Sequence, residues 1–189
     1  MKKAEQFLRQ EIEDSLDLKS TFFDQNLSDV VNLYEMLRQV GRRKARVFIF
    51  GNGGSAADAQ HFAAELVHRV EKNPIGMRAL ALHTDTSLIT ALGNDDGFSS
   101  IYARQIEVLT SPGDLAIAIS TSGNSANIVE GLKIARKKRC QTAGLLGRTG
   151  GKARSLCDLA LVVRHSSTPR IQEVHGMIIH LVCQLLERK

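Results

Sequence analysis

Short apolar runs typical of buried strands alternate with stretches of helical periodicity from Arg46 to the end of the chain. Strands that alternate with helices pair in parallel, because each connection crosses back over one face of the sheet. The sequence therefore predicts a doubly wound α/β fold with a five-stranded parallel sheet.

The boundaries of these elements follow from the ends of the apolar runs and from the turn residues between them. The predicted strands are Val47–Phe50, Ala79–Leu82, Leu115–Ile119, Ala143–Leu146 and Leu159–Val163. Helices are predicted near Ala56–Val70, Ser87–Leu92, Phe98–Leu109 and Ala126–Lys138, with a short one near Lys152–Leu156 and a last one from about Arg170 to Glu187.

Residues 1–44 precede the first strand and have helical periodicity in two sections, the second of which follows Asn26. In the first section, apolar residues recur at every fourth position from Leu8 to Leu16. Helices that precede the first strand cannot be crossover connections, so we expect them to cover the sheet or to pack against another subunit. We expect a single structural domain, made of an N-terminal helical segment (1–44) and a sheet-containing part (45–189).

Composition and charge are those of an ordinary globular protein, with 43% hydrophobic residues and a net charge of +5. The short basic runs lie where helices are expected to end, and the chain lacks Trp, so we expect no nucleic-acid partner. Cys140, Cys157 and Cys183 are far apart and form no C-x-x-C pair, which predicts reduced thiols. We see no signal peptide and no membrane span, and therefore expect a cytoplasmic protein without a membrane partner.

The first predicted strand leads into a glycine-rich turn and then into a helix. Gly51, Gly53 and Gly54 permit backbone angles that a residue with a Cβ resists, and Ser55 opens the helix. N–H groups at a helix start favour an anion, so this turn is a candidate ligand site. The turn also fits G-x-G-x-x-A, but the acidic residue expected at the end of the second strand is missing, which argues against a nucleotide cofactor.

A second polar loop, residues 120–125, follows the third predicted strand and carries four hydroxyls before a helix begins. One capping residue such as Ser125 or Asn124 would satisfy the helix, so the number of hydroxyls favours a phosphate cradle. In the flavodoxin-like strand order 2-1-3-4-5, the first and third strands are neighbours where the winding reverses, and ligands bind there. We therefore expect both loops to face one pocket.

A third polar segment, Gly93–Gly97, is predicted to be a turn. It either reaches the same pocket or is a plain surface turn, and the sequence favours neither.

The helix after the first turn carries a polar stripe, since Asp58, His61, Glu65 and His68 fall within about 80° of one another. Asp58 is expected near the helix start, where it would complement the helix dipole. His61 and Glu65 are four residues apart, a spacing that fits a surface hydrogen bond and a functional pair equally well.

The last predicted helix contains His180 among apolar residues, where a histidine is more often a core residue than a ligand. Gln172 lies about 80° and Glu173 about 20° from His180 around this helix. Spacing alone does not choose between Gln172 and Glu173 as the partner of His180.

Four segments in combination resemble the phosphoheptose isomerases, a family of sugar isomerase (SIS) domain enzymes, over nearly the whole chain. They are Phe50–Glu65, Gly93–Asp95, Ala118–Ser125 and Arg170–His175 with His180. The resemblance implies an aldose–ketose isomerase that converts sedoheptulose 7-phosphate to D-glycero-D-manno-heptose 7-phosphate through an enediol. Such enzymes supply ADP-heptose for the lipopolysaccharide core.

The resemblance also implies a homotetramer with active sites between subunits, and a role for each matching residue. Glu65 would be the catalytic base and His180 the acid. The phosphate would be held by Ser120, Thr121, Ser122 and Ser125. The sugar would contact Asn52, Gly53, Gly54, Ser55, Glu65, Asn94, Asp95 and Gln172. Several members bind zinc, which maps to His61, Glu65, Gln172 and His180 and so favours Gln172 over Glu173.

One departure from the family pattern bears on substrate preference, because Pro169 stands where some members have an acidic residue. A zinc-bound Glu65 would also be a poorer base, so the metal would be loosely held, structural or inhibitory. Two other hypotheses remain. One is an isomerase for a different sugar phosphate. The other is a non-catalytic SIS protein that binds a replication initiator, a group that lacks the carboxylate matching Glu65.

Overall fold

The structure is a computed structural model that describes residues 1–188. Its centre is a five-stranded parallel sheet with the order β2-β1-β3-β4-β5, which confirms the predicted fold and strand order. The strands are β1 (Arg46–Gly51), β2 (Arg78–Ala81), β3 (Leu115–Ser120), β4 (Gln141–Gly147) and β5 (Leu159–Val163).

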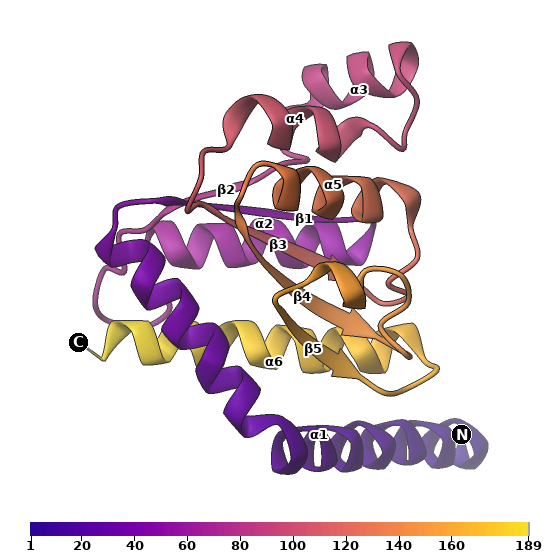
Figure 1. Cartoon of the computed structure of the whole chain (residues 1–189). Coiled ribbons are helices and arrows are strands. Elements are labelled where there is room, and N and C mark those ends of the chain that lie inside the picture. Colours follow the sequence, from indigo (N-terminus) through magenta and orange to yellow (C-terminus); the bar gives the residue numbers. More distant parts are fainter. Residues whose placement is uncertain (189) are drawn as a thin grey trace.

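Helices cover both faces of the sheet (Figure 1). One face packs against the second half of α1 (Lys2–Arg42), α2 (Gly54–Val67) and α6 (Thr168–Glu187). The other face packs against α4 (Ile101–Leu109), α5 (Ala126–Lys137) and the region of the short 3-10 helix η1 (Arg154–Leu156), with α3 (Thr86–Asp95) beyond α4.

Alternate side chains of each strand enter different cores, because successive residues of a strand point to opposite faces. In β1, Val47 and Ile49 lie in the core formed with α1, α2 and α6, whereas Phe48 and Phe50 lie in the core formed with α4 and α5. Burial on both faces is the reason that these strands read as continuous apolar runs.

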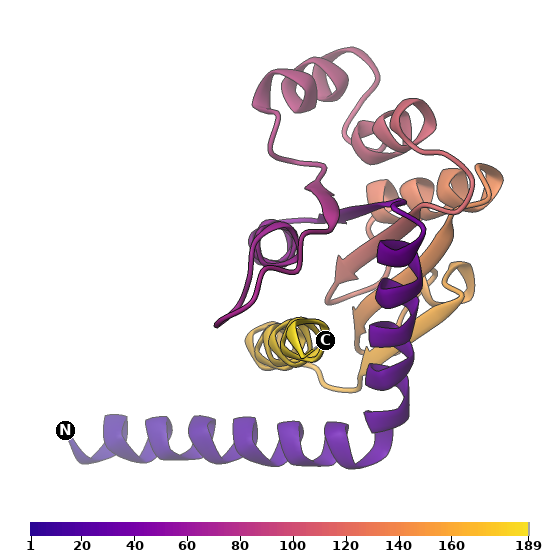
Figure 2. The same cartoon turned by 90° about the vertical axis from the view of Figure 1, so that its left-hand side faces the viewer.

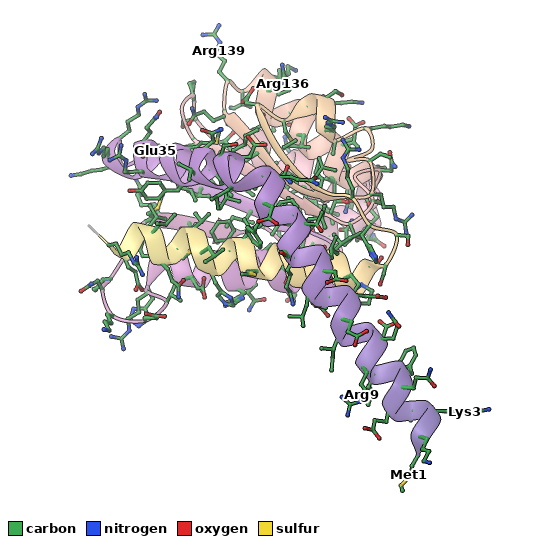
Figure 3. All side chains as sticks on the ribbon, turned by 90° about the horizontal axis from the view of Figure 1, so that it is seen from below. Met1, Lys3, Arg9, Glu35, Arg136 and Arg139 are labelled. Carbon is green, nitrogen blue, oxygen red and sulfur yellow. The ribbon has the colours of Figure 1, made fainter. Side chains whose placement is uncertain are left out.

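The two helical sections predicted before the sheet meet at a kink in α1. Asn26 has non-helical backbone angles (φ −126°, ψ 16°), and its side-chain amide donates to the carbonyl of Phe22 at 2.8 Å. After the kink, buried residues such as Leu33 and Leu37 pack on the sheet. Before the kink, Phe22 is still in the core and Ser15 is buried against α6. The N-terminal end of the helix extends away from the body of the protein, with Met1, Lys3 and Arg9 on this projecting part (Figure 2, Figure 3).

The prediction of a turn at Gly93–Gly97 is wrong for its first part, because Gly93, Asn94 and Asp95 form the end of α3. The side chain of Asp85 caps this helix by accepting the N–H of Leu88 at 2.9 Å, and Leu92 is buried beside it. These contacts outweigh the low helix propensity of a single glycine. Only Gly97, with φ +81°, has the backbone that a glycine turn requires.

No helix within residues 1–188 combines the length and the apolar character that crossing a membrane requires.

Candidate active site

The two polar loops leave the sheet side by side at the carboxyl ends of β1 and β3. Gly51, the last residue of β1, is in register with Ile119 of β3. β2 and β4 flank this pair on either side, so the winding of the sheet reverses here. The two loops therefore start from adjacent strand ends, and that they face one pocket stays a prediction.

The hydroxyl-rich loop is ordered by its own serines. Ser120 Oγ accepts the N–H of Gly123 at 3.0 Å, and Ser122 Oγ accepts the N–H of Asn124 at 3.2 Å. Ser125 stands at the N-cap position of α5, but its side chain makes no capping hydrogen bond. Capping therefore does not explain this serine, and the start of α5 is left open to an anion.

The turn after β4 supports the hydroxyl-rich loop from the side. The N–H of Ala153 donates to the carbonyl of Gly123 at 2.9 Å, and the N–H of Lys152 donates to Asn124 Oδ1 at 3.0 Å. Gly123 has φ +64°, and a Cβ there would lie 2.0 Å from the carbonyl oxygen of Gly150. The glycine is required by this close approach.

Glu65 and two histidines form a cluster between α2 and α6. Glu65 Oε1 lies 2.9 Å from His61 Nε2 and 3.4 Å from His180 Nε2. Glu65 is buried, whereas both imidazoles are about half exposed and contact each other edge-on with their centroids 5.0 Å apart. His180 is therefore not a core histidine, and His61 with Glu65 is more than an isolated surface pair.

The two carboxylate oxygens of Glu65 have different surroundings. Oε1 faces both histidines, whereas Oε2 is buried and has no hydrogen-bond partner within residues 1–188. Burial is the main cause that raises the pKa of the Cys183 thiol, and the negative charge of Glu65 raises it further. The sequence pointed to Cys183 only as a reduced thiol and not as a neighbour of the cluster, although it follows His180 by one helical turn.

The packing of α6 sends the side chains of Gln172 and Glu173 to different neighbours. The carboxylate of Glu173 is turned to α1, where it accepts from Ser15 Oγ at 2.5 Å and pairs with Arg170. Gln172 instead lies against the start of α2, since a Cβ on Gly54 would be 2.3 Å from Gln172 Nε2. Of the two residues, Gln172 is therefore the one that lies against α2, and its place in the Glu65 cluster stays a prediction.

The expected sugar-binding residues fall into two groups. Asn52 to Ser55 form the β1–α2 turn, in which Gly53 has φ +56° and the Asn52 side chain is hydrogen-bonded to Asn127. Asn94 and Asp95 are exposed on α3, and their side chains hydrogen-bond to each other at 2.7 Å. The described chain does not bring this second group to the Glu65 cluster.

The remaining members of the polar stripe have other surroundings. Asp58 is not in the first turn of α2, which contains no acidic residue, so the expectation that it complements the helix dipole is wrong. Its Oδ2 is buried without a hydrogen-bond partner in the described chain, and burial raises its pKa while His61 opposes that shift. His68 is exposed at the end of α2.

Comparison with known proteins shows the same architecture. The family model described as "SIS domain" matches residues 12–147. The structure of a phosphoheptose isomerase from Neisseria gonorrhoeae superposes with a TM-score of 0.93 at 36% identity, over 98% of this chain and 100% of that one.

Curated relatives extend the similarity to the sequence. A phosphoheptose isomerase of Trichlorobacter lovleyi is 46% identical over 182 residues, which are 96% of this chain and 93% of the relative. One from Geobacter sulfurreducens is 55% identical over 144 residues, 76% of each chain. The chain belongs to the phosphoheptose isomerase family of SIS-domain proteins.

Proposed function

We propose that the protein is an aldose–ketose isomerase that converts sedoheptulose 7-phosphate to D-glycero-D-manno-heptose 7-phosphate, for ADP-heptose and lipopolysaccharide core synthesis. The observation that carries this proposal is the Glu65 cluster, in which a buried carboxylate has one oxygen beside two histidines and the other free. The relatives are named phosphoheptose isomerases, which supports a heptose phosphate as the substrate class.

Isomerisation moves a proton between C1 and C2 of the sugar through an enediol, which requires a base near these carbons and an acid near their oxygens. Glu65 is the base, because its carboxylate lies beside both half-exposed imidazoles of the cluster. His180 is the acid, since its imidazole is half exposed beside that carboxylate and can reach a substrate oxygen.

Binding of the phosphate holds the other end of the substrate, and this remote binding energy positions the reacting carbons. Ser120, Thr121, Ser122 and Ser125 hold the phosphate at the open start of α5. The backbone of Asn52 to Ser55 and the side chain of Gln172 line the sugar. Asn94 and Asp95, which are exposed on α3, also contact the sugar.

The donor set of the cluster suits a zinc ion. The donor atoms of His61, Glu65 and His180 lie within 4.8 Å of one another, and nitrogen with carboxylate oxygen is a common zinc environment. Gln172 would be the fourth ligand. A bound zinc would act as a Lewis acid that polarises the sugar carbonyl.

We further propose a homotetramer in the cytoplasm, with active sites between subunits. Phe7, Leu8, Ile12 and Leu16 are exposed on the projecting part of α1, where a second subunit would bury them. All three cysteines are free, which suits a reducing compartment.

The test is incubation of purified protein with a panel of ketose and aldose phosphates, with products identified by chromatography and mass spectrometry. We expect turnover of sedoheptulose 7-phosphate and little turnover of the others. Turnover of a different sugar phosphate alone would reassign the substrate. No turnover on any of them, together with capture of a replication initiator, would reject the enzyme.

A further inference from the structure

Asn52 and Asn127 form a closed pair of amide hydrogen bonds between the two loops of the site. Asn52 Nδ2 donates to Asn127 Oδ1 at 2.9 Å, and Asn127 Nδ2 donates to Asn52 Oδ1 at 2.8 Å. Asn52 belongs to the β1–α2 turn, and Asn127 lies in the first turn of α5, two residues after the phosphate loop. Asn127 is only 2% exposed and Asn52 is half-buried, so the Asn127 side of the pair is shielded from competing water.

Tyr102 of α4 supports this pair from the protein interior. Its hydroxyl donates to the carbonyl of Gly51, the last residue of β1, and lies 3.5 Å from Asn52 Oδ1. Tyr102 is 2% exposed, and burial raises its pKa to about 12, so the hydroxyl stays protonated and able to donate. Asn127 Oδ1 also accepts the N–H of Ile128 at 3.0 Å.

These contacts determine what Asn52 can do. Its amide oxygen and nitrogen are both engaged with Asn127, so the side chain ties the two loops together. Gly53 and Gly54 follow Asn52 directly and open α2, the helix that carries Glu65. The amide pair therefore sets the position of the base-bearing helix relative to the phosphate loop.

We propose that Asn127, with Tyr102, is a positioning residue of the active site, which fixes the distance between the phosphate loop and the reacting end through the amide pair with Asn52. The proposal rests on the proposed isomerase function. A substrate anchored by its phosphate meets Glu65 correctly only if this distance is fixed, and an error of about 1 Å can cost roughly a hundredfold in rate.

The test is a double-mutant cycle on kcat with Asn52→Ala, Asn127→Ala and both together. We expect each single variant to lose about tenfold to a hundredfold in kcat, and the double variant to lose no more than the worse single one, because either change already opens the pair. Affinity for inorganic phosphate, measured calorimetrically, should not change, since the hydroxyls of the phosphate loop remain. Tyr102→Phe should lower kcat less.

Asn32→Ala is the matched control, because Asn32 is an exposed amide on α1, and it should keep wild-type kcat. Wild-type kcat in Asn127→Ala would overturn the proposal. So would additive losses in the cycle, because they would mean that Asn52 contacts the sugar directly.

A measurement that needs no substrate separates this proposal from the proposed function. The same cycle on the free energy of unfolding, followed by denaturant titration, should be strongly non-additive if the two amides bond to each other. Additive changes in the free energy of unfolding would show that the two amides do not bond to each other, and would overturn this proposal even if the enzyme is active. Failure of the wild type to isomerise any sugar phosphate would instead reject the proposed function alone.

Discussion

Glu65 is the residue whose chemistry depends most on its surroundings, because it is buried while the histidines beside it are half exposed. We expect Glu65→Gln, which keeps the shape but removes the basic carboxylate, to lower kcat by about 10²- to 10⁴-fold. Calorimetric affinity for inorganic phosphate should stay unchanged. Glu107→Gln, an exposed carboxylate on α4 paired with Arg104, is the matched control and should keep full turnover. An undiminished kcat in Glu65→Gln would remove Glu65 from the role of base.

The proposed metal site also depends on single residues of α2. His61 lies in the cluster with Glu65 and His180, whereas His68 is exposed at the end of the same helix. We expect His61→Ala to weaken Zn²⁺ affinity at least tenfold, because a ligand is lost, and His68→Ala to leave it unchanged. Competition with a chromophoric chelator measures both. Equal affinities in the two variants would contradict the proposed ligand set.

At the scale of elements, the packing of α6 on the start of α2 depends on Gly54. An alanine there would place its Cβ 2.3 Å from Gln172 Nε2, the end of a flexible side chain that can move away. We expect Gly54→Ala to keep or slightly raise stability, by up to about 1 kcal/mol, since alanine favours the helix. Displacement of Gln172 should nevertheless raise KM and weaken Zn²⁺ binding.

Thermal unfolding and steady-state kinetics test this separation of stability from function. Gly41→Ala is the control, because its Cβ would meet only Met77, at 3.7 Å or more. If Gly54→Ala has wild-type KM and zinc affinity, Gln172 does not act at the site.

At the scale of the whole molecule, the projecting part of α1 exposes apolar side chains that one chain does not cover. We expect Leu8→Glu combined with Ile12→Glu to shift the assembly from tetramers to smaller species, because the charges oppose burial in an interface. Light scattering after size exclusion measures the mass. Gln6→Glu with Gln10→Glu adds the same charge to the same helix at polar positions and should leave the mass unchanged. A wild-type monomer would reject the proposed tetramer.

The sequence predicted most of the fold because its signals are local. Apolar runs such as Leu115–Ile119 identified the strands, and Asn26 marked the division in the N-terminal helix. The Gly93–Asp95 segment was misjudged for the opposite reason, since the helix there is held by Asp85 and by the burial of Leu92.

The types of residue in the site were determined by the sequence alone: a carboxylate, histidines, hydroxyls and glycines at spacings that fit two loops and two helix faces. Their relations in space were decided only by the tertiary structure. Packing on α1 turns Glu173 away and leaves Gln172 beside Gly54, and pairing of β1 with β3 brings Asn52 to Asn127. The physical reason is that periodicity fixes the direction of a side chain around its own helix, whereas its partners are fixed by elements that are distant in the chain.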